Sequence, residues 1–257
     1  TLQDGVVGRA ANYTLPNALV SAAAAITPRP VTVTGVAAAA KVYDGSTAAT
    51  LGGGVVNTLV AGEDLRLGFG PGSFDTANAG SGKPVTGTAS LLDGTVGRAA
   101  NYLLLSPSVS ATGDIAPRTL TLSGVVAANK VYDGTTAATL SGGTLVGLVA
   151  GEALTVSLSG GSFASPDAGT AKAVSGSAAL ASTSTGLAGN YRLPTAVLAS
   201  ADITPRPVTL QGVSAANKVY DGTTSATLSG GTLSGLVAGQ DLRVTLVWFD
   251  PEASPGA

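Results

Sequence analysis

The sequence predicts an all-β protein built from tandem small antiparallel β domains, of the sandwich or β-grasp-like type, joined end to end as a rod. Three observations lead to this prediction. The chain repeats itself every 88 or 89 residues, as the positions of Tyr43, Tyr132 and Tyr220 show. Short runs alternate apolar and polar residues, which is typical of half-buried strands. Proline-rich junctions without a Gly/Ser linker favour a short, stiff connection between repeats.

The repeat is defined by three markers that keep the same order: Tyr-Asp-Gly, Asn-Tyr and Pro-Arg. They occur at Tyr43-Asp44-Gly45, Tyr132-Asp133-Gly134 and Tyr220-Asp221-Gly222; at Asn12-Tyr13, Asn101-Tyr102 and Asn190-Tyr191; and at Pro28-Arg29, Pro117-Arg118 and Pro205-Arg206.

These markers divide the chain into four parts. Residues 1–28 form the C-terminal part of a repeat, residues 29–117 and 118–205 are complete repeats, and residues 206–257 are the N-terminal part of a repeat with a divergent tail from Trp248. Because the chain opens inside a repeat and lacks Met, we interpret it as a piece of a longer polypeptide.

Each element of the repeat is expected to be a strand or a turn. The first strand is predicted at Val31–Thr34, and a second at Leu154–Leu158 with counterparts at residues 65–67 and 242–246. Tyr191 and Leu193 should share one face of a later strand. The last strand should place alternate residues on one side: Val197, Ala199, Ala201 and Ile203, and in the copy before it Val109, Ala111 and Ile115. A short helical turn is most conceivable at residues 145–152.

Composition excludes several classes of function. The net charge of −2 and the scattered basic residues do not predict nucleic-acid binding. The chain has no Cys and no His, which excludes disulfides, thiolate metal sites and Ser-His-Asp catalysis. No apolar run reaches the roughly 18 residues of a spanning helix. Gly80–Lys83 is followed by Pro84 and fails the phosphate-loop pattern. We therefore expect no catalytic residue, cofactor, metal or membrane-spanning segment.

The Tyr-Asp-Gly motif admits a structural and a metal-binding interpretation. Asp-Gly favours a tight turn, with the tyrosine packed at the core edge. A Ca²⁺ site needs about six oxygen ligands, whereas the nearby Glu63 and Glu152 become Gln240 in the third copy. We therefore assign a structural role to the motif residues, namely Tyr43, Asp44, Gly45, Tyr132, Asp133, Gly134, Tyr220, Asp221, Gly222, Asn101, Tyr102, Asn190 and Tyr191.

A second hypothesis is an isopeptide bond between lysine and asparagine assisted by a carboxylic acid. Lys130, Asp133 and Asn190 recur once per repeat as Lys41, Asp44 and Asn101. Since a lysine buried with an acid is uncommon, we expect a solvated lysine beside a turn instead.

The ordered motifs resemble those of the YDG repeat, which occurs in large bacterial surface proteins of the filamentous-haemagglutinin type. The matching segments are Lys130–Thr136, Leu148–Glu152, Gly161–Phe163, Asp167–Gly169, Asn190–Leu193 and Ala201–Pro205. The resemblance implies a secreted protein of the Gram-negative cell surface, associated with the outer membrane and exported by two-partner secretion. It implies no enzymatic activity.

From this we expect a non-enzymatic stalk or spacer in an adhesin, present as a monomeric rod. The alternative is a multivalent module in which each repeat binds a carbohydrate or a host protein. Contact with host glycan or protein is expected through the full-length protein.

Overall fold

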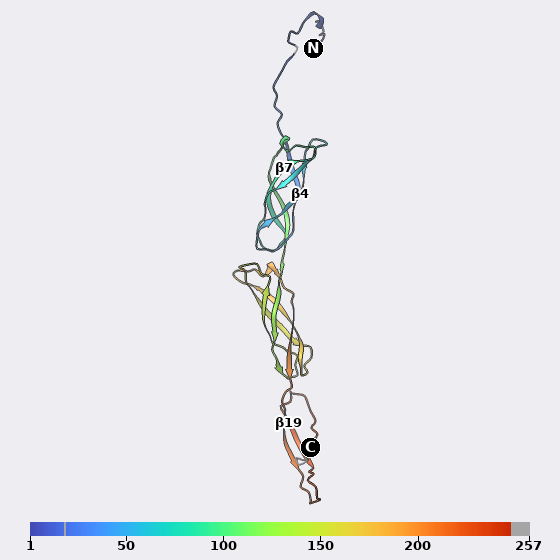
Figure 1. Ribbon diagram of the computed structural model, residues 1–257, viewed down its shortest axis with the longest axis vertical. Coiled ribbons are helices and arrows are strands. Elements are labelled where there is room, and N and C mark those ends of the chain that lie inside the picture. Colours follow the sequence, from blue (N-terminus) through green and yellow to red (C-terminus); the bar gives the residue numbers. More distant parts are fainter. Residues whose placement is uncertain (18, 248–257) are drawn as a thin grey trace, which may run out of the picture. The chain divides into compact units, whose positions relative to one another are not determined.

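The computed structural model describes residues 1–17 and 19–247 as β-strands joined by turns, and it confirms the all-β prediction (Figure 1). No α-helix occurs in this part of the chain; the helical turns within it are short 3₁₀ turns. None of the helices in the described residues is long and apolar enough to cross a membrane.

The first complete repeat contains nine strands and one 3₁₀ turn, which lies between the seventh and eighth strands. Its elements are β1 (Arg29–Ala38), β2 (Lys41–Val42), β3 (Ala48–Ala49), β4 (Leu51–Asn57), β5 (Leu65–Phe69), β6 (Gly72–Phe74), β7 (Gly80–Asp93), η2 (Ala99–Asn101), β8 (Tyr102–Leu104) and β9 (Ser108–Ala116).

The second repeat follows the same order, and the described part of the third begins it again. The second repeat contains β10 (Arg118–Thr119), β11 (Thr121–Ala127), β12 (Lys130–Val131), β13 (Leu140–Val146), β14 (Leu154–Phe163), β15 (Gly169–Ser182), η3 (Ala188–Asn190), β16 (Tyr191–Arg192) and β17 (Ala196–Thr204). The third contains β18 (Thr209–Ala215) and β19 (Leu228–Ser234), and η1 (Ala10–Asn12) precedes the first complete repeat.

The long strand pairs are antiparallel, as expected, but short parallel pairs make the sheets mixed. β15 pairs antiparallel with both β14 and β17, and β11 with β13. The strand that follows the Pro-Arg junction pairs in parallel with the Asn-Tyr strand, in β1·β8 and β10·β16. The strand before Tyr-Asp-Gly likewise pairs in parallel with the last strand, in β12·β17. A parallel pair needs a long connection, and the body of the repeat provides it.

Alternating residues form the core in the way that the sequence predicts. Val197, Ala201 and Ile203 of β17 are buried, and Ala199 between them is half-buried. Ala201 and Ile203 form one cluster with Phe163 and Val174, against which Tyr132 and Leu140 pack. Small domains hold together through clusters of this kind. The predicted face shared by Tyr191 and Leu193 is also confirmed, since both are buried.

Two predicted elements are wrong. Residues 242–246 are not a strand. Their counterparts β5 and β14 are held by the long strands β7 and β15, and no segment of the described residues takes that place beside 242–246, so its backbone lacks a ladder partner. Residues 145–152 end a strand and make a turn rather than a helix. The 3₁₀ turns instead end at the asparagine of each Asn-Tyr pair. The tail predicted to diverge from Trp248 lies outside the described residues.

The chain divides into two compact units that differ from the sequence repeats. Unit 1 comprises Thr1–Ala40, Thr47–Thr76 and Gly82–Asp114. Unit 2 comprises Lys41–Ser46, Ala77–Ser81 and the described residues from Ile115 onward. Two short segments of the first repeat therefore pack within unit 2, where β2 pairs in parallel with Ile115 and Ala116.

Candidate functional site

The Tyr-Asp-Gly motif is a closed turn held by the lysine that precedes it. In unit 2 the Asp44 carboxylate accepts hydrogen bonds from the Ser46 backbone N–H at 2.8 Å and from the Ser46 hydroxyl at 2.9 Å. The Lys41 ammonium lies 2.7 Å from the same carboxylate oxygen and also donates to the Ser46 carbonyl and hydroxyl. Gly45 has a φ of 79°, a left-handed conformation that glycine adopts without strain.

The same turn occurs in all three copies. Lys130 pairs with Asp133 and Lys218 with Asp221, each at 2.8 Å, and each lysine also bonds Thr135 or Thr223. The lysine hydrogen bond, followed by backbone donation, lowers the pKa of Asp133 to about 2. The same two causes lower the pKa of Asp44 to about 2. These aspartates therefore stay ionised at neutral pH and lock the turn locally.

A glutamate in unit 2 joins two tyrosines that come from successive sequence repeats. The Tyr43 hydroxyl donates to one oxygen of the Glu152 carboxylate, and the Tyr191 hydroxyl donates to the other at 2.7 Å. The two rings meet edge to face, with centroids 5.3 Å apart and an interplanar angle of 78°. Both tyrosines are buried. The Tyr191 hydroxyl also accepts from the Val149 backbone N–H at 3.0 Å. We call Tyr43, Glu152 and Tyr191 the tyrosine–glutamate cluster.

The electrostatics of the cluster favour neutral tyrosines beside a carboxylate. Burial, and then the hydrogen bond to Glu152, raise the pKa of Tyr43 to about 12. Burial also raises the pKa of Tyr191. A phenol with a raised pKa remains a hydrogen-bond donor over a wide pH range, so both hydroxyls keep their protons near neutrality.

The asparagine of the Asn-Tyr pair, Asn190, makes further contacts between the two sequence repeats within unit 2. Asn190 is buried, with 2 % of its surface exposed. Its side-chain oxygen accepts from the Ala79 backbone N–H at 2.9 Å, and its side-chain nitrogen donates to Asn78 at 3.1 Å. A Cβ on Gly45 would lie 3.0 Å from the Val149 side chain, so this glycine allows close approach as well as the turn. The recurring motifs thus contact one another within unit 2.

In unit 1 a single tyrosine, Tyr102, binds the corresponding glutamate, Glu63. The Tyr102 hydroxyl donates to Glu63 at 2.5 Å and accepts from the Val60 backbone N–H at 3.1 Å. These contacts match those of Tyr191 with Glu152 and Val149. The hydrogen bond to Glu63 raises the pKa of Tyr102.

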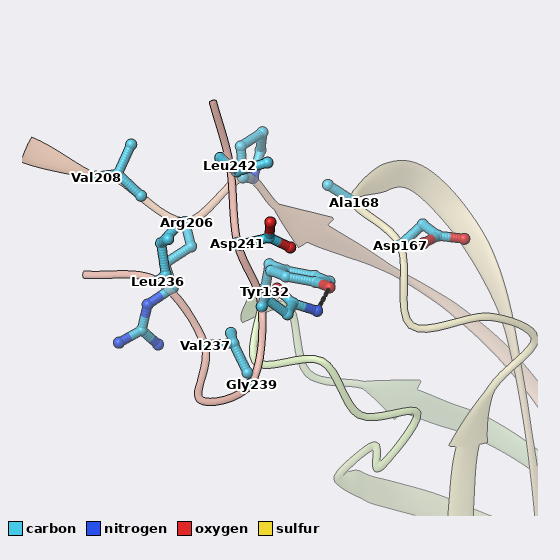
Figure 2. A pocket seen from close by; sticks show the side chains of 12 residues that line it. Tyr132, Asp167, Ala168, Arg206, Val208, Leu236, Val237, Gly239, Asp241 and Leu242 are labelled. Carbon is cyan, nitrogen blue, oxygen red and sulfur yellow. Dashed lines mark hydrogen bonds between the residues drawn. The ribbon is translucent and has the colours of Figure 1, made fainter. Parts of the chain in front are cut away.

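A third version of the tyrosine contact lies beside a cavity in unit 2 (Figure 2). The Gln240 side-chain nitrogen donates to the Tyr132 hydroxyl at 2.6 Å, so glutamine reverses the direction of the bond that glutamate makes. The cavity has a volume of about 610 Å³, and its lining includes Asp167, Ala168 and Arg206.

The structure separates the residues of the isopeptide hypothesis. Lys130 bonds Asp133 and Thr135, whereas Asn190 bonds Asn78 and Ala79. For the metal hypothesis, the described residues contain no group of three or more acidic, His or Cys side chains that could hold an ion. The remaining motif residues differ in exposure: Tyr132 is half-buried, while Tyr220 and Asn101 are exposed.

Sequence reasoning missed the role of Glu63, Glu152 and Gln240, because it considered them only as metal ligands. A usable signal was present. Each lies 20 residues after the tyrosine of its Tyr-Asp-Gly motif, as the pairs Tyr43/Glu63, Tyr132/Glu152 and Tyr220/Gln240 show. A position with fixed spacing that always carries a side-chain oxygen fits a hydrogen bond to tyrosine.

Comparison with known protein families assigns the chain to a family. The YDG domain model matches residues 27–111, 116–198 and 204–250. Searches of curated proteins and of solved structures gave no match. Since the three matches cover more than half of the chain, the protein belongs to the YDG domain family.

Proposed function

We propose that this chain is a non-enzymatic spacer in the stalk of a secreted bacterial surface adhesin. The observation that carries the proposal is the tyrosine–glutamate cluster, in which Glu152 binds Tyr191 of its own repeat and Tyr43 of the preceding one. When the recurring motif residues of one repeat bind the neighbouring repeat, they stabilise a tandem array of repeats.

The competing function, a ligand-binding module in each repeat, uses the repeated side chains differently. A binding surface presents recurrent aromatic residues to solvent. Here Tyr43, Tyr102 and Tyr191 are buried, and their hydroxyls are bonded to glutamates. This use of the motif supports the spacer over the binding module.

The cellular setting of the proposal comes from the family resemblance. YDG repeats occur in surface proteins of the filamentous-haemagglutinin type, which are exported by two-partner secretion and act as adhesins. We extend that setting to this chain, with host contact made by other parts of the full-length protein.

Binding assays with the isolated chain test the proposal. A fluorescently labelled chain is applied to a glycan array and to cultured epithelial cells, with the heat-unfolded chain as the control for non-specific adhesion. The spacer proposal expects no saturable signal above the control. Saturable binding by the folded chain would support the ligand-binding module instead.

A further inference from the structure

The three motifs that define the repeat lie at its short parallel strand pairs. The strand after Pro-Arg pairs with the strand that begins at the Asn-Tyr tyrosine: Arg118 with Tyr191 in unit 2, and Arg29 with Tyr102 in unit 1. The strand before Tyr-Asp-Gly pairs with the last strand, in β2·β9 and in β12·β17. The most regular residues of the sequence are thus placed where parallel strands meet.

The first parallel pair of the second repeat, β10·β16, joins the beginning of the repeat to a strand close to its end. Arg118 pairs with Tyr191, and the Leu120 backbone N–H continues the ladder to the Arg192 carbonyl at 2.8 Å. Strands β11 to β15 lie between these two places in the sequence. A pull on the chain at Arg118 can therefore pass directly to β16 and on to β17, without extending the strands in between.

The relative direction of the strands decides how a pull acts on this pair. Tension along the chain pulls β10 from its N-terminal end and β16 from its C-terminal end. Because the two strands are parallel, these pulls act in opposite directions along the ladder and load its hydrogen bonds together. An antiparallel pair such as β11·β13 is instead pulled from one end, so its bonds break one after another. A parallel ladder therefore resists tension better than an antiparallel ladder with the same number of bonds.

The second parallel pair of the same repeat, β12·β17, is loaded in the same sense. Lys130 pairs with Ile203, and the Tyr132 backbone N–H donates to the Thr204 carbonyl at 2.9 Å. The Thr204 hydroxyl adds a bond to the Lys130 carbonyl at 3.3 Å. The Lys130 ammonium binds Asp133 at 2.8 Å and so attaches the Tyr-Asp-Gly turn to the end of this pair. Two ladders loaded in shear thus protect the body of the repeat.

The tyrosine–glutamate cluster fastens two of these pairs to each other within unit 2. Tyr43 directly follows β2, and its backbone N–H donates to the Ala116 carbonyl at 2.9 Å. Tyr191 is the first residue of β16. Glu152 accepts a hydrogen bond from each of the two hydroxyls. The parallel pairs on the two sides of Pro117 are therefore bound to one carboxylate, so a pull on this junction meets both.

We propose that the repeat bears tensile force and that its short parallel strand pairs are the elements that resist extension. The inference deepens the proposed function and rests on it, because a stalk transmits the pull between the cell that carries an adhesin and the surface to which the adhesin attaches. The recurring motifs then share one role. Pro-Arg and Asn-Tyr form the first pair, and Tyr-Asp-Gly closes the second, while the remaining strands stay folded and free of tension.

Single-molecule force spectroscopy in two pulling geometries tests the proposal, since forced unfolding reports the unfolding barrier. The chain contains no Cys, so two engineered cysteines attach the handles to the full chain at chosen places. Pro117→Cys with Thr195→Cys loads β10·β16 in shear. Pro117→Cys with Gly189→Cys pulls both strands from their N-terminal ends and peels them apart. All three positions are exposed, and a Cβ on Gly189 meets nothing within 4 Å. Ser184→Cys, also exposed and N-terminal to β16, gives a second peeling geometry.

The shear geometry should need a higher unfolding force than either peeling geometry. All of them extend nearly the same stretch of chain, about 250 Å at roughly 3.3–3.6 Å per residue, so strands β11 to β15 contribute alike. Thermal melting followed by circular dichroism selects variants that fold like the wild type. Equal forces, or a higher force on peeling, overturn the proposal. The outcome is independent of the glycan and cell assays, which test the spacer by its binding, so the two failures are distinguishable.

Discussion

At the residue scale, the position that matters most lies 20 residues after each Tyr-Asp-Gly tyrosine and carries Glu63, Glu152 and Gln240 in the three copies. Glu152 binds two tyrosine hydroxyls, one with each carboxylate oxygen, whereas Glu63 binds the single hydroxyl of Tyr102. A buried hydroxyl without an acceptor is costly. The same residue type should therefore contribute more to stability at 152 than at 63.

The first prediction concerns coupling between Tyr43 and Glu152. Glu152→Ala should lower the free energy of unfolding by about 1–3 kcal/mol, because buried hydroxyls lose their acceptor. In a double-mutant cycle with Tyr43→Phe, measured by urea unfolding, the two changes should be non-additive. The matched control is Glu63→Ala with Tyr43→Phe, whose effects should add. Additivity in both cycles would show that Tyr43 and Glu152 are not energetically coupled.

The second prediction concerns alkaline pH. The pKa of Tyr43 is raised from 10.0 to about 12. A group whose pKa is raised in the folded state stabilises it fully below the unfolded pKa, and this contribution is lost as pH rises. Stability should therefore fall between pH 10 and pH 12. Thermal unfolding followed by circular dichroism should show a smaller fall for Tyr43→Phe than for the wild type. An equal fall in the two proteins would rule out this role for Tyr43.

At the element scale, each repeat begins with an antiparallel strand pair whose ladder is interrupted by glycines. In β11 and β13 the register skips from Ser123↔Thr144 to Val125↔Gly142. Gly143 in the skipped position has a φ of 98°, which side-chain-bearing residues rarely adopt. The same skip occurs in β1·β4 and β18·β19. The distortion is thus a built feature of the repeat, comparable to a β-bulge.

The third prediction tests this distortion. Gly143→Ala should destabilise unit 2 by at least about 1–2 kcal/mol, the usual cost of a left-handed residue with a side chain. Its Cβ would also lie 3.0 Å from the Leu122 side chain. The control is Gly52→Ala, where an added Cβ meets nothing within 4 Å. Chemical denaturation compares the two. Similar small effects at both positions would mean that the kink tolerates a side chain.

At the scale of the whole molecule, the junction between repeats carries the spacer hypothesis. Pro205, Arg206 and Pro207 lead from β17 toward β18 with no Gly/Ser linker. Two prolines restrict the backbone to extended conformations. The end-to-end arrangement of the repeats remains a prediction from this sequence.

The fourth prediction is that the chain is elongated. Small-angle scattering should give a radius of gyration well above the roughly 18 Å expected of a compact chain of this length. Replacing Pro205-Arg206-Pro207 with Gly-Ser-Gly should broaden the distance distribution without unfolding either neighbouring repeat. A compact particle would remove the physical basis of the spacer.

The sequence by itself determined the all-β class, the repeat and the buried faces of the strands. These follow from local patterns: β17 alternates along its length, and Asp-Gly makes a turn in every copy, because strand periodicity and glycine conformation depend on near neighbours alone. Only the tertiary structure decided what the motifs contact. Tyr43 and Glu152 are 109 residues apart, and no local pattern encodes that meeting. Likewise, residues 242–246 have the pattern of a strand but pair with no segment among residues 1–17 and 19–247, and a strand is defined by its ladder.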